Sequence, residues 1–214
     1  MRFADAPATI VIAAITVVAS VGVFLSGSLP YAAIAGGFIP VRFDASVMAG
    51  EMPWLMPAWL TPLTATLLHG GAAHLALNMV MLVFCGVLTE RAIGARGMVL
   101  LYVAGAYAAA LVQWAIGPLS DVPMIGASGA ISAIVAAHAI SYGQARTRSF
   151  GPISANMLHV VWLAAGWIGI QTLIGLAGMA GGDGVVVAIG AHIGGFIVGL
   201  ALAKPLLLWR YRGA

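Results

Sequence analysis

Two polar residues in an otherwise apolar sequence are of the types that carry acyl-transfer chemistry. Ser128 stands in the run Gly-Ala-Ser-Gly, and His192 stands in the run Ala-His-Ile-Gly-Gly. A serine hydroxyl is a weak nucleophile until a base takes its proton, and a neutral imidazole suits that task at physiological pH. We therefore interpret Ser128 as a nucleophile and His192 as its general base.

A second pair, His74 and Asn78, is suited to stabilising negative charge. Attack on a carbonyl creates an oxyanion, and each preorganised donor typically contributes about 10²–10³ in rate. His74 and Asn78 are four residues apart, so in a helix both project from one face. The backbone N–H of Ser128 would be a third donor, since the first N–H groups of a helix lack intrahelical partners. We predict an oxyanion site at His74, Asn78 and the Ser128 amide.

The glycines beside Ser128 and the positions of the acidic residues bear on how the serine and the histidine would work. Gly126 and Gly129 remove side-chain bulk, which would let a substrate backbone approach the hydroxyl. All acidic residues lie in loops or at the ends of apolar segments, which favours a dyad over a triad. Asp121 and Asp183 are the alternatives for a third member, although both lie outside the apolar segments. The residues predict no metal and no cofactor.

The composition indicates that a lipid bilayer surrounds these residues. Hydrophobic residues make up 62% of the 214 residues and charged residues only 7%. Such a chain has too few polar residues to cover the surface of a soluble globular protein. A helix needs about 20 apolar residues to cross roughly 30 Å of hydrocarbon. Six segments satisfy this length, with ends good to a few residues, near 8–27, 69–89, 97–117, 126–143, 157–178 and 186–208. We predict an all-α polytopic membrane protein, a single domain over 1–214.

The basic residues predict the orientation of these segments, because Lys and Arg are retained in short cytoplasmic loops. Of nine Lys and Arg residues, only Arg42 falls on the opposite side from the rest, which lie at the termini and after the second and fourth segments. Both termini are therefore predicted to be cytoplasmic. The net charge of +3 reflects this anchoring, so no nucleic-acid partner is inferred.

The same orientation places the four candidate residues at one depth. The second, fourth and sixth segments all run inward, and each carries its candidates in its outer part. Polar groups at membrane depth are costly and usually face a protein interior or a water-filled cavity. We therefore expect the four candidate residues to share an aqueous pocket that is open to the outside.

Two parts of the chain have alternative interpretations. The first segment could be a cleaved secretory signal, with Arg2 before it and Val18-Ala-Ser20 as cleavage site, but its apolar run is longer than usual. The region 28–66, called here the first-loop region, is rich in Pro and contains Trp54 and Trp59. Because Trp prefers the membrane interface, we expect this region to be partly embedded at the outer surface.

Three motifs together resemble those of rhomboid intramembrane serine proteases. They are His69-Gly-Gly-Ala-Ala-His74-Leu-Ala-Leu-Asn78-Met79 with Glu90 beyond it, Gly126-Ala-Ser128-Gly129, and Ala191-His192-Ile-Gly-Gly195-Phe-Ile-Val-Gly199. The resemblance implies a six-helix rhomboid-like bundle in which Ser128 and His192 are catalytic and His74 and Asn78 bind the oxyanion.

The resemblance also implies how helices pack and what is cleaved. Gly195 and Gly199 would form the small-residue face by which segment 186–208 packs against segment 126–143. Substrates would be single-span membrane proteins, cut in or near the membrane at small residues beside helix-weakening sequence. Substrate access between the second and fifth segments is a further implication. The chain alone names neither the substrate nor an oligomeric state, and its short loops favour a bacterial inner membrane.

Two departures from the family pattern are visible. The family commonly has a Trp-Arg pair in the first loop, whereas Trp59 is followed by Leu and Thr, which puts the bracing of this loop in doubt. Four residues after the serine the family has Tyr or Phe, which stacks on the histidine, but this chain has Ser132. Either the imidazole is oriented less firmly, or Ser132 forms hydrogen bonds within the site.

Simpler interpretations exist for each motif on its own. Gly-Ala-Ser-Gly suits helix packing, His74 with Asn78 suits an interhelical hydrogen bond, and His192 suits a proton relay in a small transporter. A catalytically silent protein that binds membrane clients is another class. We expect structural roles for His69 and for Glu90 beside Arg91, and interfacial positions for His138 and His159.

Overall fold

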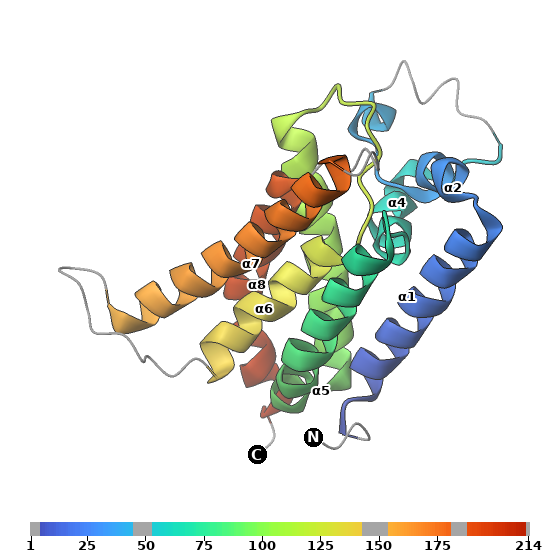
Figure 1. Ribbon diagram of the computed structural model, residues 1–214. Coiled ribbons are helices and arrows are strands. Elements are labelled where there is room, and N and C mark those ends of the chain that lie inside the picture. The colour runs from blue at the N-terminus through green and yellow to red at the C-terminus, as the bar shows by residue number, and fades with distance from the viewer. Residues whose placement is uncertain (1–4, 45–52, 143–153, 181–187, 213–214) are drawn as a thin grey trace.

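The computed structural model describes residues 5–44, 53–142, 154–180 and 188–212, and most of this part is helical (Figure 1). The main helices are α1 (Pro7–Ser26), α5 (Ala72–Ile116), α6 (Ser128–Tyr142), α7 (Ala155–Ala180) and α8 (Ile189–Arg210). The described residues contain no strand, only an isolated bridge between Phe38 and Met124. The predicted all-α fold is therefore confirmed.

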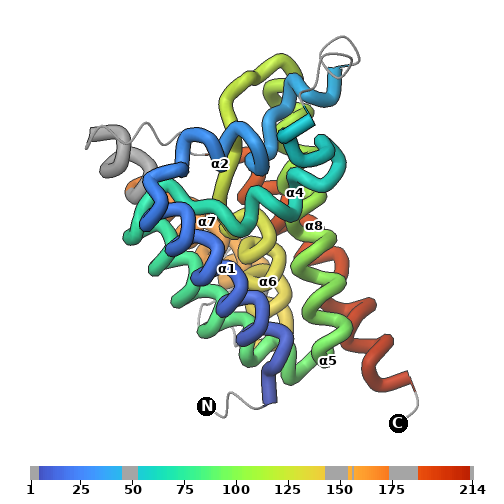
Figure 2. The backbone as a smooth tube through the Cα atoms, turned by 90° about the vertical axis from the view of Figure 1, so that its right-hand side faces the viewer, coloured from blue at the N-terminus to red at the C-terminus, as the bar shows by residue number. Residues whose placement is uncertain are grey.

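Helix α5 supplies two of the six predicted segments. Its 45 residues would extend about 68 Å if straight, more than twice the roughly 30 Å of a hydrocarbon core. Gly94 interrupts it with φ 77° and ψ 164°, a backbone conformation that favours glycine. Figures 1 and 2 both show the chain reversing there, so the two halves of α5 run in opposite directions.

The other predicted segments coincide with single helices. Helices α1, α5 and α8 are long and apolar enough to cross a membrane, while Ser128–Tyr142 and Met157–Leu173 are shorter apolar stretches. The second and fourth segments begin slightly later than predicted, at Ala72 and Ser128. Glycines explain both shifts, since hydropathy includes Gly70, Gly71 and Gly126 in the apolar run but the backbone is not yet helical there.

Helix α6 lies at the centre of the bundle. Every residue from Ser128 to Ala137 is buried, and the helix contacts α5, α7 and α8. Its 15 residues span only about 22 Å, so it is too short to cross the hydrocarbon alone. Figures 1 and 2 show residues 117–127 descending along the bundle before α6 begins, which places its first residue inside the protein.

The first-loop region is folded into short helical pieces. They are α2 (Leu29–Gly36), η2 (Pro40–Phe43), η3 (Ala58–Leu60), α4 (Thr61–Thr64) and η4 (Ala65–Leu67). Arg42 is buried and its Nη2 donates a hydrogen bond to the Met56 carbonyl at 2.6 Å. An arginine thus braces this region, although from a different position than the family pattern suggested. Trp54 and Trp59 are exposed, as an interfacial position would require.

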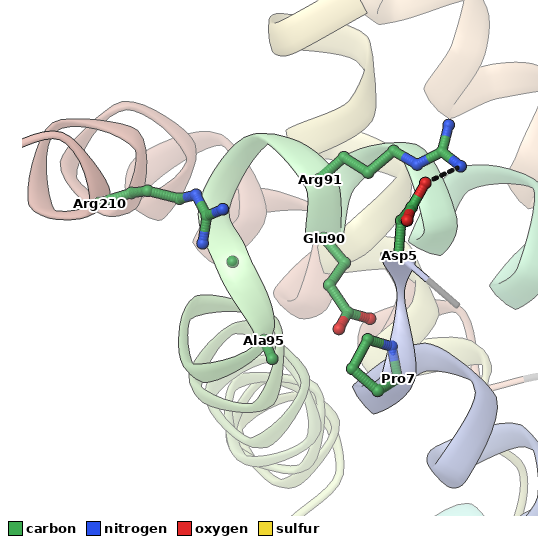
Figure 3. A pocket seen from close by; sticks show the side chains of 7 residues that line it. Asp5, Pro7, Glu90, Arg91, Ala95 and Arg210 are labelled. Atoms are coloured by element: carbon green, nitrogen blue, oxygen red, sulfur yellow. Dashed lines mark hydrogen bonds and ion pairs between the residues drawn. The ribbon is translucent and has the colours of Figure 1, made fainter. Parts of the chain in front are cut away.

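The opposite end of the bundle holds both chain termini (Figures 1 and 2). There the Glu90 carboxylate accepts hydrogen bonds from the amides of Ala8 and Thr9 and from the Thr9 hydroxyl, at 2.6–2.9 Å. The expected structural role of Glu90 is thus a cap on the first amides of α1, and Arg91 forms an ion pair with Asp5. A cavity of about 450 Å³ lies between these groups and Arg210 (Figure 3).

Candidate active site

Ser128 and His192 meet in the interior of the bundle. The Ser128 Oγ lies 2.8 Å from the His192 Nε2, a hydrogen-bonding distance. Ser128 is 8% exposed and His192 is 4% exposed, so neither group is freely hydrated. Ser128 is the first residue of α6, and its amide therefore has no intrahelical acceptor.

Backbone contacts hold the segment that leads into Ser128. The amide of Gly126 donates to the Ala65 carbonyl at 2.9 Å, and Phe38 and Met124 exchange two backbone hydrogen bonds. Gly126 has φ 118°, which L side chains rarely adopt, and a Cβ there would lie 2.9 Å from the His74 Nε2. Glycine at this position thus serves both the turn into α6 and the close approach of His74.

Glycines on α8 bring His192 to the serine. A Cβ at Gly195 would overlap the Gly129 carbonyl oxygen, and a Cβ at Gly199 would overlap the Ala133 carbonyl oxygen. The two helix backbones are therefore in direct contact. Gly129 itself faces Ala109 and Ala191, so its missing side chain makes room for neighbouring helices.

His192 has no acidic partner in the described part of the chain. Its Nδ1 is buried and forms no hydrogen bond. Asp121 is exposed in the segment before α6 and contacts neither His192 nor Ser128. Asp183, the other acid considered for a triad, lies outside the described residues. Within the described residues, Ser128 and His192 therefore pair without a carboxylate as a third member.

His74 and Asn78 lie in the first turns of α5, and the His74 ring reaches Gly126, two residues before Ser128. The His74 Nδ1 accepts a long hydrogen bond of 3.4 Å from the Gly70 amide, so in the neutral ring the Nε2 carries the proton. The Asn78 Nδ2 donates to the His74 carbonyl at 2.9 Å, which leaves its second N–H unused. Asn78 is fully buried, and its Oδ1 has no hydrogen-bond partner.

His69 has a more specific position than the sequence indicated. Its Nδ1 lies 2.8 Å from the Ser20 hydroxyl of α1, and its Nε2 accepts a hydrogen bond of 3.5 Å from the Ala127 amide. Its ring also contacts the ring of His74 edge-on, with centroids 5.0 Å apart. His69 therefore joins α1 to the residue that precedes Ser128. In the sequence, the only indication that His69 lies at the site is its position five residues before His74.

Ser132 forms hydrogen bonds within the site, which is one of the two alternatives left by the sequence. Its Oγ donates to the Ser128 carbonyl and accepts from the Trp167 Nε1, both at 2.7 Å. Ser132 is fully buried and Trp167 is 3% exposed. Nothing in the sequence pointed to Trp167, because it stands in an apolar run that contains another tryptophan.

Other polar groups are separate from this arrangement. His138 lies ten residues after Ser128, or about 15 Å along α6, and its ring stacks on Tyr142. Among the described residues no cluster of His, Cys, Asp or Glu is suited to hold a metal ion.

Comparison with protein families gives one match, a Rhomboid domain over residues 57–209. This range includes all three motifs that carry the resemblance. It also contains Ser128, His192, His74 and Asn78, and it covers well over half of the chain.

Individual relatives come from plants, bacteria and humans. The chain is 28% identical over 169 residues to RHOMBOID-like protein 4 of Arabidopsis thaliana, which is 78% of this chain and 37% of that protein. It is 29% identical over 147 residues to Rhomboid protease GluP of Bacillus subtilis (strain 168), which is 69% of this chain and 27% of that protein. Rhomboid-related protein 3 of Homo sapiens is 38% identical over 78 residues, covering 36% and 18% of the two chains. The chain thus spans well under half the length of these relatives.

Proposed function

Since the chain belongs to the rhomboid family of polytopic membrane proteins, we propose that it is an intramembrane serine endopeptidase acting through a Ser128–His192 dyad. The observation that carries this proposal is the 2.8 Å contact between the Ser128 Oγ and the His192 Nε2. The contact joins residues on two helices, far apart in sequence, in a geometry that lets an imidazole accept the serine proton.

The proposed reaction begins at the serine hydroxyl. Ser128 Oγ attacks the substrate carbonyl carbon while its proton passes to the His192 Nε2. Collapse of the tetrahedral intermediate breaks the C–N bond, and the imidazolium returns the proton to the leaving amine. Water then attacks the resulting ester of Ser128 while its proton passes to His192. Collapse breaks the bond between the acyl carbon and the Ser128 Oγ, the imidazolium returns the proton to this oxygen, and the acid product leaves.

Three donors are proposed for the oxyanion. The His74 Nε2 carries a proton that its own helix does not use, because the Nδ1 is the acceptor for Gly70. Asn78 has one N–H left after its bond to the His74 carbonyl. The Ser128 amide is free of intrahelical bonding at the start of α6. Such donors stabilise charge best in a site that excludes bulk water.

The proposed substrates are transmembrane segments of single-span membrane proteins. Breaking backbone hydrogen bonds in lipid costs several kcal/mol for each unsatisfied group. A substrate segment that is already weak as a helix reduces this cost, so Gly or Pro near the cut is expected. A small residue before the scissile bond is carried over from the family alone.

The distribution of basic residues supports an orientation with both termini on the cytoplasmic side. The matched relatives include plant and human proteins, so they do not favour a bacterial membrane over others.

Fluorophosphonate labelling of the detergent-purified protein tests the activity. The native chain should be labelled, whereas Ser128→Ala and His192→Ala should not. Ser26→Ala, at an exposed serine on α1, and His159→Ala on α7 are matched controls that should label normally. Cleavage of a reporter with a single transmembrane segment should follow the same pattern.

A folded native chain that neither reacts with the probe nor cleaves the reporter would contradict the proposal. If that chain still captured a membrane client, the client-binding class would replace it.

A further inference from the structure

Among the described side chains of α7, Trp167 is the largest one buried in the bundle. Of these described side chains only Trp167 and Gln171 are buried, and the others are exposed or half-buried. Trp167 packs in the same core cluster as the residues of α6. Trp162, on the same helix, is 70% exposed. Trp167 is therefore one of the side chains through which α7 packs on α6, together with Val160 and Ala164 at the edge of the same cluster.

A directed pair of hydrogen bonds runs from this side chain to the serine. An indole N–H can only donate, so the Trp167 Nε1 donates to the Ser132 Oγ at 2.7 Å. The Ser132 hydroxyl proton is then directed to the Ser128 carbonyl, also at 2.7 Å. The order Trp167, Ser132, Ser128 is thus set by donor chemistry.

The Ser132 hydroxyl is enclosed by the protein and has no access to solvent. Ser132 is fully buried, and α8 approaches so closely that a Cβ at Gly195 would lie 3.2 Å from the Ser132 Cβ. Removing either partner would leave a buried polar group without its hydrogen bond. The Ser128 carbonyl belongs to the residue whose hydroxyl meets His192, at the first position of α6, where the backbone has the fewest helical restraints.

We propose that Trp167 and Ser132 are positioning residues that couple the placement of α7 to the orientation of Ser128. When α7 is packed on α6, the two hydrogen bonds hold the Ser128 peptide so that its hydroxyl points to His192. When α7 moves away, the bond from Trp167 opens and Ser128 is less well aligned for proton transfer. Small misalignments of reacting groups have large effects on rate. This inference rests on the proposed roles of Ser128 and His192.

The test is a double-mutant cycle with Ser132→Ala, Trp167→Phe and the combined variant. The measured quantity is the second-order rate constant of fluorophosphonate labelling at Ser128, together with kcat and KM on a cleavable reporter. Each single variant should label about 5- to 10-fold more slowly, as expected for one lost buried hydrogen bond. The effect should fall on kcat with KM little changed. The combined variant should be no slower than the slower single variant, because both partners of one interaction are then absent.

Trp162→Phe is the matched control, since it makes the same change on an exposed face of α7 and should label at the native rate. Thermal melting in detergent establishes that each variant is folded. If one single variant does not fold, the other is compared directly with Trp162→Phe.

The possible failures are distinguishable. A native chain that reacts, with single variants that react equally fast, overturns the positioning role alone. Fully multiplicative effects in the cycle also overturn it, because they indicate two independent packing defects. A native chain that does not react at all overturns the proposed function and this inference with it.

Discussion

At the scale of single residues, the proposed roles of the two histidines near Ser128 require their protons on opposite nitrogens. The His192 Nε2 faces the Ser128 hydroxyl and can accept its proton, which leaves Nδ1 as the protonated nitrogen. The His74 Nδ1 accepts from Gly70, which leaves Nε2 as the donor. One ring is therefore arranged as a base and the other as a hydrogen-bond donor, although both are neutral imidazoles of the same kind.

The proposed role of His74 and Asn78 as oxyanion donors predicts a specific kinetic effect when either side chain is removed. His74→Ala and Asn78→Ala should each lower kcat for reporter cleavage by about 10²-fold, with KM little changed, because an oxyanion donor acts mainly in the transition state. Steady-state kinetics in detergent measures this. His159→Ala, on α7, should retain native kinetics. A loss of less than about 3-fold in folded His74→Ala would argue against its role as a donor.

At the scale of helices, the contact between α6 and α8 depends on glycine. Gly195 and Gly199 bring the two backbones so close that a single methyl group has no space at either position. Lipid supplies little hydrophobic force between helices, so close van der Waals packing must hold them together. The distance between Ser128 and His192 is thus a consequence of residues one and two turns away from the histidine.

Gly199→Ala should therefore separate the two helices. We expect a loss of stability of about 1–3 kcal/mol, the usual cost of overpacking, and fluorophosphonate labelling reduced by at least 10-fold. Thermal melting and labelling rates measure these effects. Gly166→Ala on α7 is the matched control: nothing lies within 4 Å of its added Cβ, and alanine is the better helix former, so it should be neutral or stabilising. Native labelling in folded Gly199→Ala would contradict the packing argument.

At the scale of the whole molecule, α1 is joined to the bundle at both ends. Ser20, near one end of α1, contacts His69, which in turn accepts from the amide of Ala127 beside Ser128. At the other end, the Glu90 carboxylate of α5 caps the amides of Ala8 and Thr9, which no residue of α1 itself satisfies. A negative charge at a helix N-terminus is also favoured by the helix dipole.

Glu90→Gln tests this connection. The amide keeps the size of the side chain but has only one oxygen for three donors, so we expect a loss of about 1–3 kcal/mol and a lower melting temperature. Asp5→Asn should have a small effect, because its ion pair with Arg91 is partly exposed and such pairs contribute little. Equal melting temperatures for the two variants would contradict the capping role.

Three properties could be predicted from the amino-acid sequence without the structure. The chain is a membrane protein, its apolar segments form a helical bundle, and four polar residues are candidates for catalysis. These properties depend on local composition and short spacing: a segment of about 20 apolar residues spans a bilayer whatever its neighbours are. The motifs around Ser128, His192, His74 and Asn78 are also local, so they could be recognised without knowing how the helices pack.

The hydrogen bonds that hold these residues in place became visible only in the tertiary structure. The bond from Trp167 to Ser132 joins residues 35 apart, the bond from Ala127 to His69 joins residues 58 apart, and Glu90 contacts α1 across more than 80 residues. Arg42, which the family pattern did not predict, braces the first-loop region through Met56. Partners of this kind leave no periodic signal in a sequence, because each depends on which helix faces lie together and at what distance.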